Sequence, residues 1–355
     1  MSGVTEDKVL PNPADDTNGP QAPAAEPSEG VLWRRLLRTN TAWIFLVLIL
    51  LVAFFSILKP NNFPTEFNIR AIATNAAVLL IIAVGETFVI ITGGIDLSVG
   101  YVLLFSGVTA AQTMNAFGNP TDRGWDLILL GLLVALVSGL AWGTINGVLV
   151  TKAKVPPLIV TLGTLGMAWG MAQILSNGQD IRYIPSLLAS VVGAGKFFAV
   201  PWLVVIAALV AAAGAIVLRM TRFGRYTFGV GSNEEAARRA GINVDRHLIK
   251  VYALSGLLAG FGGFLALAYF TTTTISGHAN DNLNAIAAVV IGGTSLTGGI
   301  GTVVGTTIGV FIPAILASGF IIIGLQSFWQ NVAVGAVLIA AVFVDQLRRR
   351  SRERS

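Results

Sequence analysis

Residues 219–250 read RMTRFGRYTFGVGSNEEAARRAGINVDRHLIK and form the one long charged segment in an otherwise apolar chain. The centre of this segment has the pattern of a short helix with its own start and stop. Ser232 and Glu235 have the S-x-x-E spacing of a capping box, in which two side chains satisfy free backbone donors. Gly241 stands where a left-handed residue would end the helix. The pattern therefore predicts a short helix between two apolar regions.

The predicted helix has a charged rim and a smooth face. Glu234 with Arg238, and Glu235 with Arg239, are i,i+4 pairs in the favourable order. The opposite face consists of the methyl groups of Ala236, Ala237 and Ala240. A helix of about eight residues is roughly 12 Å long and is unstable alone. Another surface must hold it, either a soluble partner or the rest of its own chain.

The composition indicates a membrane protein. Of the 355 residues, 54% are hydrophobic and only 12% are charged, whereas soluble domains carry about 25% charged residues. Apolar runs of about 20 residues recur from Thr41 onward, which is the length of a transmembrane helix. The net charge is +5, and the basic residues lie at the ends of these runs. Their placement therefore reports membrane topology and does not indicate a nucleic-acid partner.

Several kinds of chemistry are excluded. The chain has no cysteine, which removes disulfides, thiol nucleophiles and thiolate metal sites. His247 and His278 are the only histidines and are far apart, so we expect no catalytic residue and no metal site. We expect His278, beside Asp281, to be a solvated loop residue. No G-x-x-x-x-G-K-[ST] loop occurs. The chain is therefore expected to be no enzyme and to bind no cofactor, and any ATP and magnesium would be bound by a partner.

The apolar runs predict an all-α membrane protein with about ten transmembrane helices. The expected spans are 41–58, 71–92, 98–116, 126–150, 157–175, 200–218, 249–270, 284–297, 301–320 and 326–345. Residues 1–30 are rich in Pro, Ala and acids and are expected to be a disordered tail. Residues 31–347 would form the transmembrane domain, with the charged loop at 219–250, and 348–355 would be a basic C-terminal tail.

The lysines and arginines predict the orientation. With both termini inside, the cytoplasmic side collects the basic residues near both ends, Lys152, Lys154 and the whole 219–250 segment. The other side keeps only Lys59, Arg70, Arg123, Arg182 and Lys196. This asymmetry follows the positive-inside rule. Both termini and the short helix are therefore expected in the cytoplasm.

Two glycine-rich segments interrupt apolar runs. Residues 92–100 read TGGIDLSVG and 291–299 read IGGTSLTGG, with G-G-x-[DS]-L-[ST]-x-G in common. Broken helices at membrane depth are tolerated only where protein buries them or they line a cavity. We therefore expect helix breaks that face a pathway or a helix interface. The candidate residues are Gly93, Gly94, Asp96, Ser98, Gly292, Gly293, Thr294 and Ser295. Two alternatives explain the shared pattern: an internal duplication, or convergence of glycine-rich segments.

Two acids lie in or beside the second span. An acid within the membrane is by default a functional hypothesis. We expect Asp96 to cap the third span through amides near Ser98. Glu86 has three open roles: it touches substrate, carries a proton, or pairs with another helix. The candidates for a hydrophilic path are Asn75, Gln112, Asn146, Gln173, Gln326, Gln330 and Asn331.

Three blocks of this sequence resemble the membrane subunits of ribose-, xylose- and arabinose-type ABC importers of bacteria. They are Gly85–Gly100 (GETFVIITGGIDLSVG), Thr221–Tyr226 with Gly231–Arg238 and Gly241–Val244, and Ala285–Leu296 (AIAAVVIGGTSL). The likeness extends over about residues 40–345. Departures from the family pattern occur at Glu86, at Asn282–Asn284 and in the run Thr271–Thr274, and they concern the substrate more than the mechanism.

The resemblance implies a permease for a pentose or hexose in the bacterial inner membrane. It implies a second, identical permease subunit, cytoplasmic ATPase subunits that bind ATP and magnesium, an extracytoplasmic sugar-binding protein, and membrane lipid. The residues that it assigns to ATPase coupling are Gly231, Ser232, Asn233, Glu234, Glu235, Ala236, Ala237, Arg238 and Gly241. Three alternatives stay open: a proton-coupled transporter using Glu86 or Asp96, a membrane-embedded enzyme, and an ABC permease for a non-sugar solute such as a branched-chain amino acid.

Overall fold

The structure of the protein is a computed structural model that describes Gly3 and residues 40–117, 124–182, 184–326 and 328–353. The chain divides into two units, 1–39 and 40–355. The predicted tail 1–30, apart from Gly3, lies outside the described residues. The second unit carries every feature described below.

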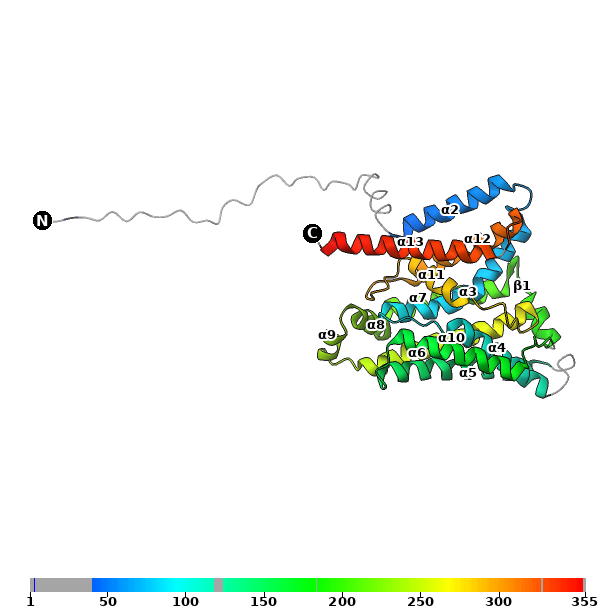
Figure 1. Ribbon diagram of the computed structural model, residues 1–355, viewed down its shortest axis with the longest axis horizontal. Coiled ribbons are helices and arrows are strands. Elements are labelled where there is room, and N and C mark those ends of the chain that lie inside the picture. Colours follow the sequence, from blue (N-terminus) through cyan, green and yellow to red (C-terminus); the bar gives the residue numbers. More distant parts are fainter. Residues whose placement is uncertain (1–2, 4–39, 118–123, 183, 327, 354–355) are drawn as a thin grey trace. The chain divides into compact units, whose positions relative to one another are not determined.

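The described residues of the second unit form helices and one short hairpin (Figure 1). The elements are α2 (Asn40–Leu58), α3 (Glu66–Ile91), α4 (Val99–Ala116), α5 (Trp125–Thr151), α6 (Pro157–Ser176), the π-helix η1 (Leu188–Gly193), β1 (Lys196–Phe197), β2 (Val200–Pro201), α7 (Trp202–Met220), α8 (Arg222–Ser232), α9 (Glu234–Arg239), α10 (Val244–Phe270), α11 (Asp281–Ile291), α12 (Val303–Ile323) and α13 (Phe328–Glu353). The two strands pair antiparallel, with Lys196 opposite Pro201.

Six helices of the described residues are long and apolar enough to cross a membrane: α3, α5, α6, α7, α10 and α12. The all-α membrane class is confirmed, whereas the count of ten spans is not. The other four predicted spans correspond to α2, α4, α11 and α13. The clearest case is α11, which has 11 residues and is about 16 Å long, half of the hydrocarbon thickness of about 30 Å. It ends at Ile291, not at the predicted 297.

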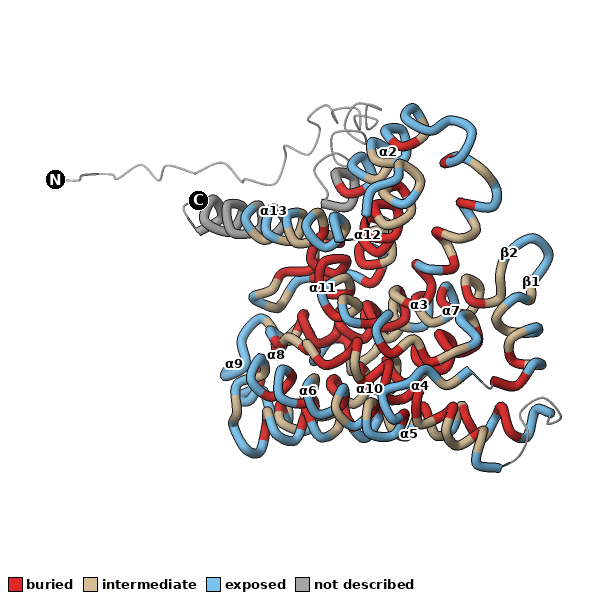
Figure 2. The backbone as a smooth tube through the Cα atoms, turned by 45° about the vertical axis from the view of Figure 1, so that its right-hand side comes forward, coloured by how far each residue is buried: buried red, intermediate tan, exposed pale blue. Residues whose placement is uncertain are grey.

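Helices α3 and α10 form the centre of the unit (Figure 2). Protein buries 94% of the apolar window of α3 and 72% of that of α10, against 33% for α5 and 28% for α6 and α7. The outer helices thus leave most of their apolar surface free, as lipid contact requires. The residues with the most restricted surroundings therefore lie on α3 and α10.

Glycines bring α10 close to its neighbours. A methyl group added at Gly139 of α5 would overlap the carbonyl oxygen of Gly256 of α10 and lie 2.8 Å from Gly260. A methyl group added at Gly263 of α10 would likewise overlap the carbonyl oxygen of Leu103 in α4. Small residues allow such backbone contact between membrane helices. Gly256, Gly260 and Gly263 therefore let α10 pack closely against α5 and α4.

Candidate functional site

The predicted charged helix exists as α9, residues Glu234–Arg239, but its cap differs from the prediction. Asn233 has extended backbone, and its Oδ1 accepts a hydrogen bond from the Ala236 amide at 2.9 Å. Ser232 is instead the last residue of α8, so the predicted Ser232–Glu235 capping box is wrong. The reason is that a preceding helix, which the sequence pattern did not reveal, occupies the backbone of Ser232.

The predicted end of the helix is confirmed. Gly241 has φ +83°, and its amide donates to the carbonyl of Arg238 at 3.0 Å. The next amide, of Ile242, donates to the carbonyl of Ala237 at 3.1 Å. These bonds satisfy carbonyls that the helix end leaves free. Helix α9 is therefore a short helix with a defined start and a defined stop.

The alanine face of α9 is partly buried and partly exposed. Ala237 is buried against Val230 and Val244, with Ile242 and Leu248 packed beside them. Ala236 and Ala240 are exposed. The chain itself therefore holds the short helix through Ala237, and two methyl groups and the charged rim remain accessible.

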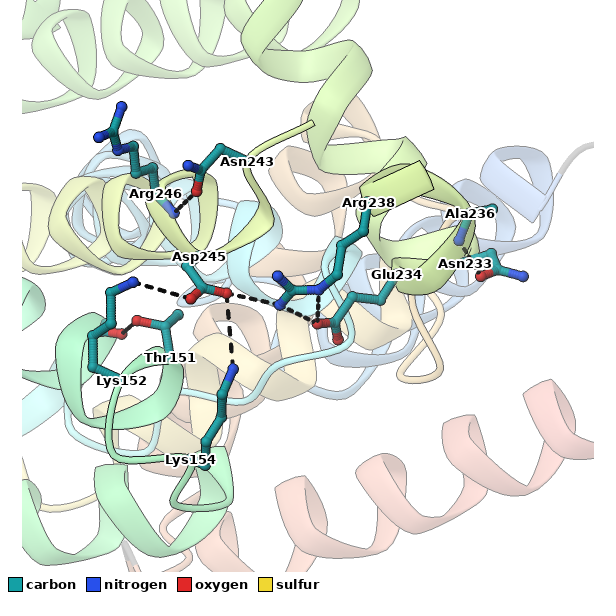
Figure 3. Close-up of polar contacts among 11 residues, drawn as sticks. Thr151, Lys152, Lys154, Asn233, Glu234, Ala236, Arg238, Asn243, Asp245 and Arg246 are labelled. Atoms are coloured by element: carbon teal, nitrogen blue, oxygen red, sulfur yellow. Dashed lines mark hydrogen bonds and ion pairs between the residues drawn. The ribbon is translucent and has the colours of Figure 1, made fainter. Parts of the chain in front are cut away.

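Ion pairs tie α9 to two other parts of the chain (Figure 3). Arg238 binds Glu234 at 2.8 Å and Asp245, in the first turn of α10, at 2.7 Å. Lys152, directly after α5, reaches Asp245 at 3.1 Å, and Lys154 lies 3.8 Å from it. Hydrogen bonds to the Asp245 and Glu234 carboxylates raise the pKa of Arg238 above its ordinary value. Arg238 therefore stays charged around neutral pH. The ionic network of Arg238, Glu234, Asp245, Lys152 and Lys154 fixes α9 against α5 and α10.

The end of α8 touches both predicted helix breaks. A methyl group at Gly231 would overlap the carbonyl oxygen of Ile91, the last residue of α3, and lie 2.7 Å from the amide nitrogen of Gly299. The Gly299 amide donates to that same carbonyl at 2.8 Å. A methyl group at Gly299 would lie 2.7 Å from Oγ of Ser232. We call this contact of Ile91, Gly231, Ser232 and Gly299 the glycine junction. Ile91 was not predicted as a functional residue, because nothing local distinguishes it.

The two breaks have the same local geometry. Gly93 and Gly293 have φ +80° and +88°. The amides of Gly93 and Gly94 donate to the carbonyls of Ile90 and Val89 at 2.9 and 3.1 Å. In the second break, the amides of Gly293 and Thr294 donate to the carbonyls of Val290 and Val289 at 2.9 and 3.2 Å. Left-handed glycines with this bonding end helices, so both breaks are confirmed as helix ends.

Asp96 makes the predicted contact with the Ser98 amide, although Ser98 itself is the N-cap residue of α4. Its Oδ1 accepts hydrogen bonds from the amide of Ser98 at 3.0 Å and from its hydroxyl at 2.5 Å. Asn146 donates to Oγ of Ser98 at 2.9 Å, and Ser255 donates to Oδ2 of Asp96 at 3.4 Å. The carboxylate thus joins the first break to α5 and α10. Asp96 is 1% exposed, so these bonds compensate for its burial.

Glu86 is fully buried and bonds to the break rather than to another helix. Its Oε1 accepts a hydrogen bond from the amide of Asp96 at 3.1 Å. Its Oε2 has no partner among the described residues, and the same holds for the Tyr252 hydroxyl and Oδ1 of Asn146. The structure therefore brings Glu86 next to Asp96 in one polar cluster at the first break.

The polar residues suggested for a hydrophilic path separate into groups. Asn75 and Gln330 line a cavity of about 200 Å³, whereas Gln112 donates to the carbonyl of Leu175 at 2.7 Å. Asn331 accepts from Asn280 at 2.8 Å. We call the cavity lined by Asn75 and Gln330 the distal cavity. Its lining residues are Asn75, Val78, Leu79, Tyr269, Phe270, Gly277, His278, Asp281, Asn284, Pro313, Ala314, Ala317 and Gln330.

The expectation of a solvated His278 is wrong. The residue is 6% exposed. Its Nδ1 lies 2.7 Å from Oδ2 of Asp281, and its Nε2 lies 2.9 Å from Oγ1 of Thr274. Burial follows because the segment after α10 turns back onto the bundle instead of extending into solvent. Among the described residues no group of three or more His, Asp or Glu side chains is arranged to hold a metal ion.

Comparisons with known proteins are consistent over nearly the whole chain. The family model described as "Branched-chain amino acid transport system / permease component" matches residues 68–342. "Ribose import permease protein RbsC" of Escherichia coli (strain K12) is 37% identical over 316 residues, which cover 87% of this chain and 96% of the relative.

Two further relatives have other sugars in their names. "Galactose/methyl galactoside import permease protein MglC" of Escherichia coli (strain K12) is 33% identical, over 86% of this chain and 94% of the relative. "D-allose transport system permease protein AlsC" of the same strain is 33% identical, over 85% and 90%. No solved structure matches the chain.

Proposed function

The chain belongs to the family of branched-chain amino acid transport system permease components, and from this membership we propose that it is the membrane permease of an ABC importer for monosaccharides. The observation that carries the proposal is the similarity to ribose, galactose and allose permeases at 33–37% identity over at least 85% of the chain. The family's own description concerns amino acids, and this keeps a branched-chain amino acid as the alternative cargo.

The proposal assigns the driving reaction to another chain. The sequence has no phosphate loop, so ATP and magnesium bind to a separate cytoplasmic ATPase. Helix α9 is the docking element for that ATPase. Three observations support this role: its charged rim, the exposed methyl groups of Ala236 and Ala240, and its anchoring by Ala237 and Arg238 to the rest of the chain.

The proposed topology has ten membrane segments of unequal length, with α2, α4, α11 and α13 inserted beside the six longer helices. Both termini lie in the cytoplasm of a bacterial cell, and the permease sits in the inner membrane as a pair of identical subunits. The distribution of Lys and Arg supports this orientation. The ionic network adds support, because it gathers Lys152, Lys154 and Arg238 around Asp245 at one end of the helices.

The test begins with purification of the tagged chain from its native membrane in mild detergent, followed by identification of the accompanying chains by mass spectrometry. We expect a stoichiometric ATPase that carries a phosphate loop. The complex is then reconstituted in liposomes with its binding protein, and uptake of labelled ribose, galactose, allose and leucine is measured with and without ATP. ATP-dependent uptake of a sugar is the expected result.

Other outcomes would contradict the proposal in distinct ways. ATP-dependent uptake of leucine without any sugar would make the cargo an amino acid. Uptake by the chain alone, driven by a pH gradient without ATP, would replace the ABC mechanism with proton coupling through Glu86 or Asp96.

A further inference from the structure

The distal cavity lies far from the ionic network that holds α9. The two regions are separated by most of α10, since Asp245 belongs to its first turn and Phe270 is its last residue. A helical segment of this length spans about 38 Å. The cavity therefore belongs to the part of the protein most distant from the proposed ATPase.

Three amide side chains in the cavity have no hydrogen-bond partner within the described part of the chain: Asn75, Asn284 and Gln330. Each amide offers two donors and one acceptor with two lone pairs. Asn75 is exposed although it lies on α3, the most buried of the candidate spans. A free amide within a membrane helix is costly unless water or a polar ligand satisfies it.

The rest of the lining combines an acid with apolar walls. Asp281 is held by His278 through one carboxylate oxygen, Oδ2, which leaves the other oxygen as an acceptor. Tyr269 and Phe270 supply two aromatic rings with centroids 4.9 Å apart, and α12 supplies a smooth wall around Ala314 and Ala317. Small-molecule sites generally have this form, with a few converging polar groups on a mostly apolar surface.

The geometry points to a binding subsite for one monosaccharide in the distal cavity, and we propose this as a specific extension of the permease function on which it rests. A sugar presents hydroxyl groups that both donate and accept, which matches the three amides and the free carboxylate oxygen. It also presents apolar C–H faces, which match the rings and the alanines. A cavity of about 200 Å³ is smaller than the roughly 300–1,000 Å³ of sites for drug-sized ligands, as a single sugar ring requires.

The subsite is connected to the coupling end by the helices that end in the breaks. Asn75 lies on α3, which ends at Ile91 in the glycine junction. Asp281 and Asn284 lie on α11, which ends at Ile291 directly before the second break. About 24 Å of α3 and about 15 Å of α11 separate the cavity residues from these ends. A displacement at the junction therefore reaches the sugar subsite directly along α3, and along α11 through the second break.

The test uses the natural absence of cysteine. Asn284→Cys and Gln330→Cys each introduce a single thiol into the cavity. Asn61→Cys, on an exposed residue before α3, is the matched control. The full chain, with the chains that accompany it, is placed in liposomes and treated with a water-soluble thiol reagent. The rate of labelling is measured without addition, and with millimolar ribose, galactose or leucine.

We expect at least one sugar to slow labelling of both cavity thiols threefold or more, while the control thiol is unaffected and leucine has no effect. Unchanged labelling of both cavity thiols, or equal slowing at Asn61→Cys, would overturn the subsite. Protection by leucine alone would also overturn it. Uptake by the unmodified complex is measured in parallel. Sugar uptake without protection would refute only the subsite, whereas absence of sugar uptake would refute the proposed function itself.

Discussion

The glycine junction and the distal cavity are opposite kinds of packing within one helical unit. At the junction, backbone atoms of three separate segments touch, and a single methyl group at Gly231 has no room. At the cavity, about 200 Å³ is left open and three amides have no partner within the described residues. Under the proposed function, the tight packing coincides with the place where motion would be transmitted, and the open space with the place where a sugar would bind.

The largest effect is expected from Gly231→Ala. The added methyl group overlaps the Ile91 carbonyl, and overpacking of this kind costs about 1–3 kcal/mol. We expect a lower thermal unfolding midpoint in detergent and at least a tenfold loss of ATP-dependent uptake. Gly229→Ala is the matched control on the same helix, because its methyl group would meet no atom closer than 3.9 Å. Equal behaviour of the two variants would contradict the tight junction.

The next effect is expected from Ala236→Trp on the exposed face of α9. This bulky side chain has room in the chain itself but blocks close docking of a partner. We expect a normal unfolding midpoint, loss of the co-purifying ATPase, and about a tenfold loss of uptake.

Ala237→Trp provides the contrast, because Ala237 is buried against Val230 and Val244. This variant should therefore be destabilised. A stable Ala237→Trp protein would contradict the observed packing of α9.

A smaller effect is expected from filling the cavity with Ala317→Leu. The distal cavity has room for the added carbon atoms, so the unfolding midpoint should stay within about one degree of the unmodified protein. Sugar uptake should fall about tenfold, because the ring no longer fits. Together with Gly231→Ala, this change compares added volume at the two regions. Strong destabilisation by Ala317→Leu would show that the cavity is not available space.

Asp245→Asn tests the ionic network and should have a modest effect. Arg238, Lys152 and Lys154 lose their shared partner, but these cations are at least 41% exposed, and exposed pairs contribute about 0.2–1 kcal/mol each. We expect a small decrease in the unfolding midpoint.

The size of this decrease should not change between pH 6 and 9. A cation whose pKa is raised in the folded state contributes below its unfolded pKa, and for Arg238 that value lies far above this range. If the difference in unfolding midpoint between Asp245→Asn and the unmodified protein varied across this pH range, the role given to the Arg238–Asp245 ion pair would be contradicted.

The smallest effect is expected from Glu86→Gln. Glutamine keeps the oxygen that accepts the Asp96 amide, and its NH₂ group replaces an oxygen that has no partner among the described residues. ATP-dependent uptake should stay within about twofold. A complete loss of uptake in a stable Glu86→Gln protein would instead favour the proton-carrying role for Glu86.

Much of this protein is determined by local sequence. The apolar runs predict the helices, and the paired glycines predict the breaks at Gly93 and Gly293, because only glycine readily adopts the left-handed conformation that ends these helices. Gly241 marks the end of α9 for the same reason. Such features depend on a few neighbouring residues, and a single sequence therefore reveals them.

Other features appear only in the tertiary structure. The cap of α9 is Asn233, because α8 extends through Ser232, and the helix is anchored by Ala237 rather than by all three alanines. Ile91 meets Gly231 and Gly299 through backbone atoms alone, and His278 is buried because its loop folds back. Backbone contacts between distant segments leave no periodic or compositional pattern. Local sequence thus determined the apolar helices and the glycines that stop them, while the packing decided which of those ends touch and where a space remains between them.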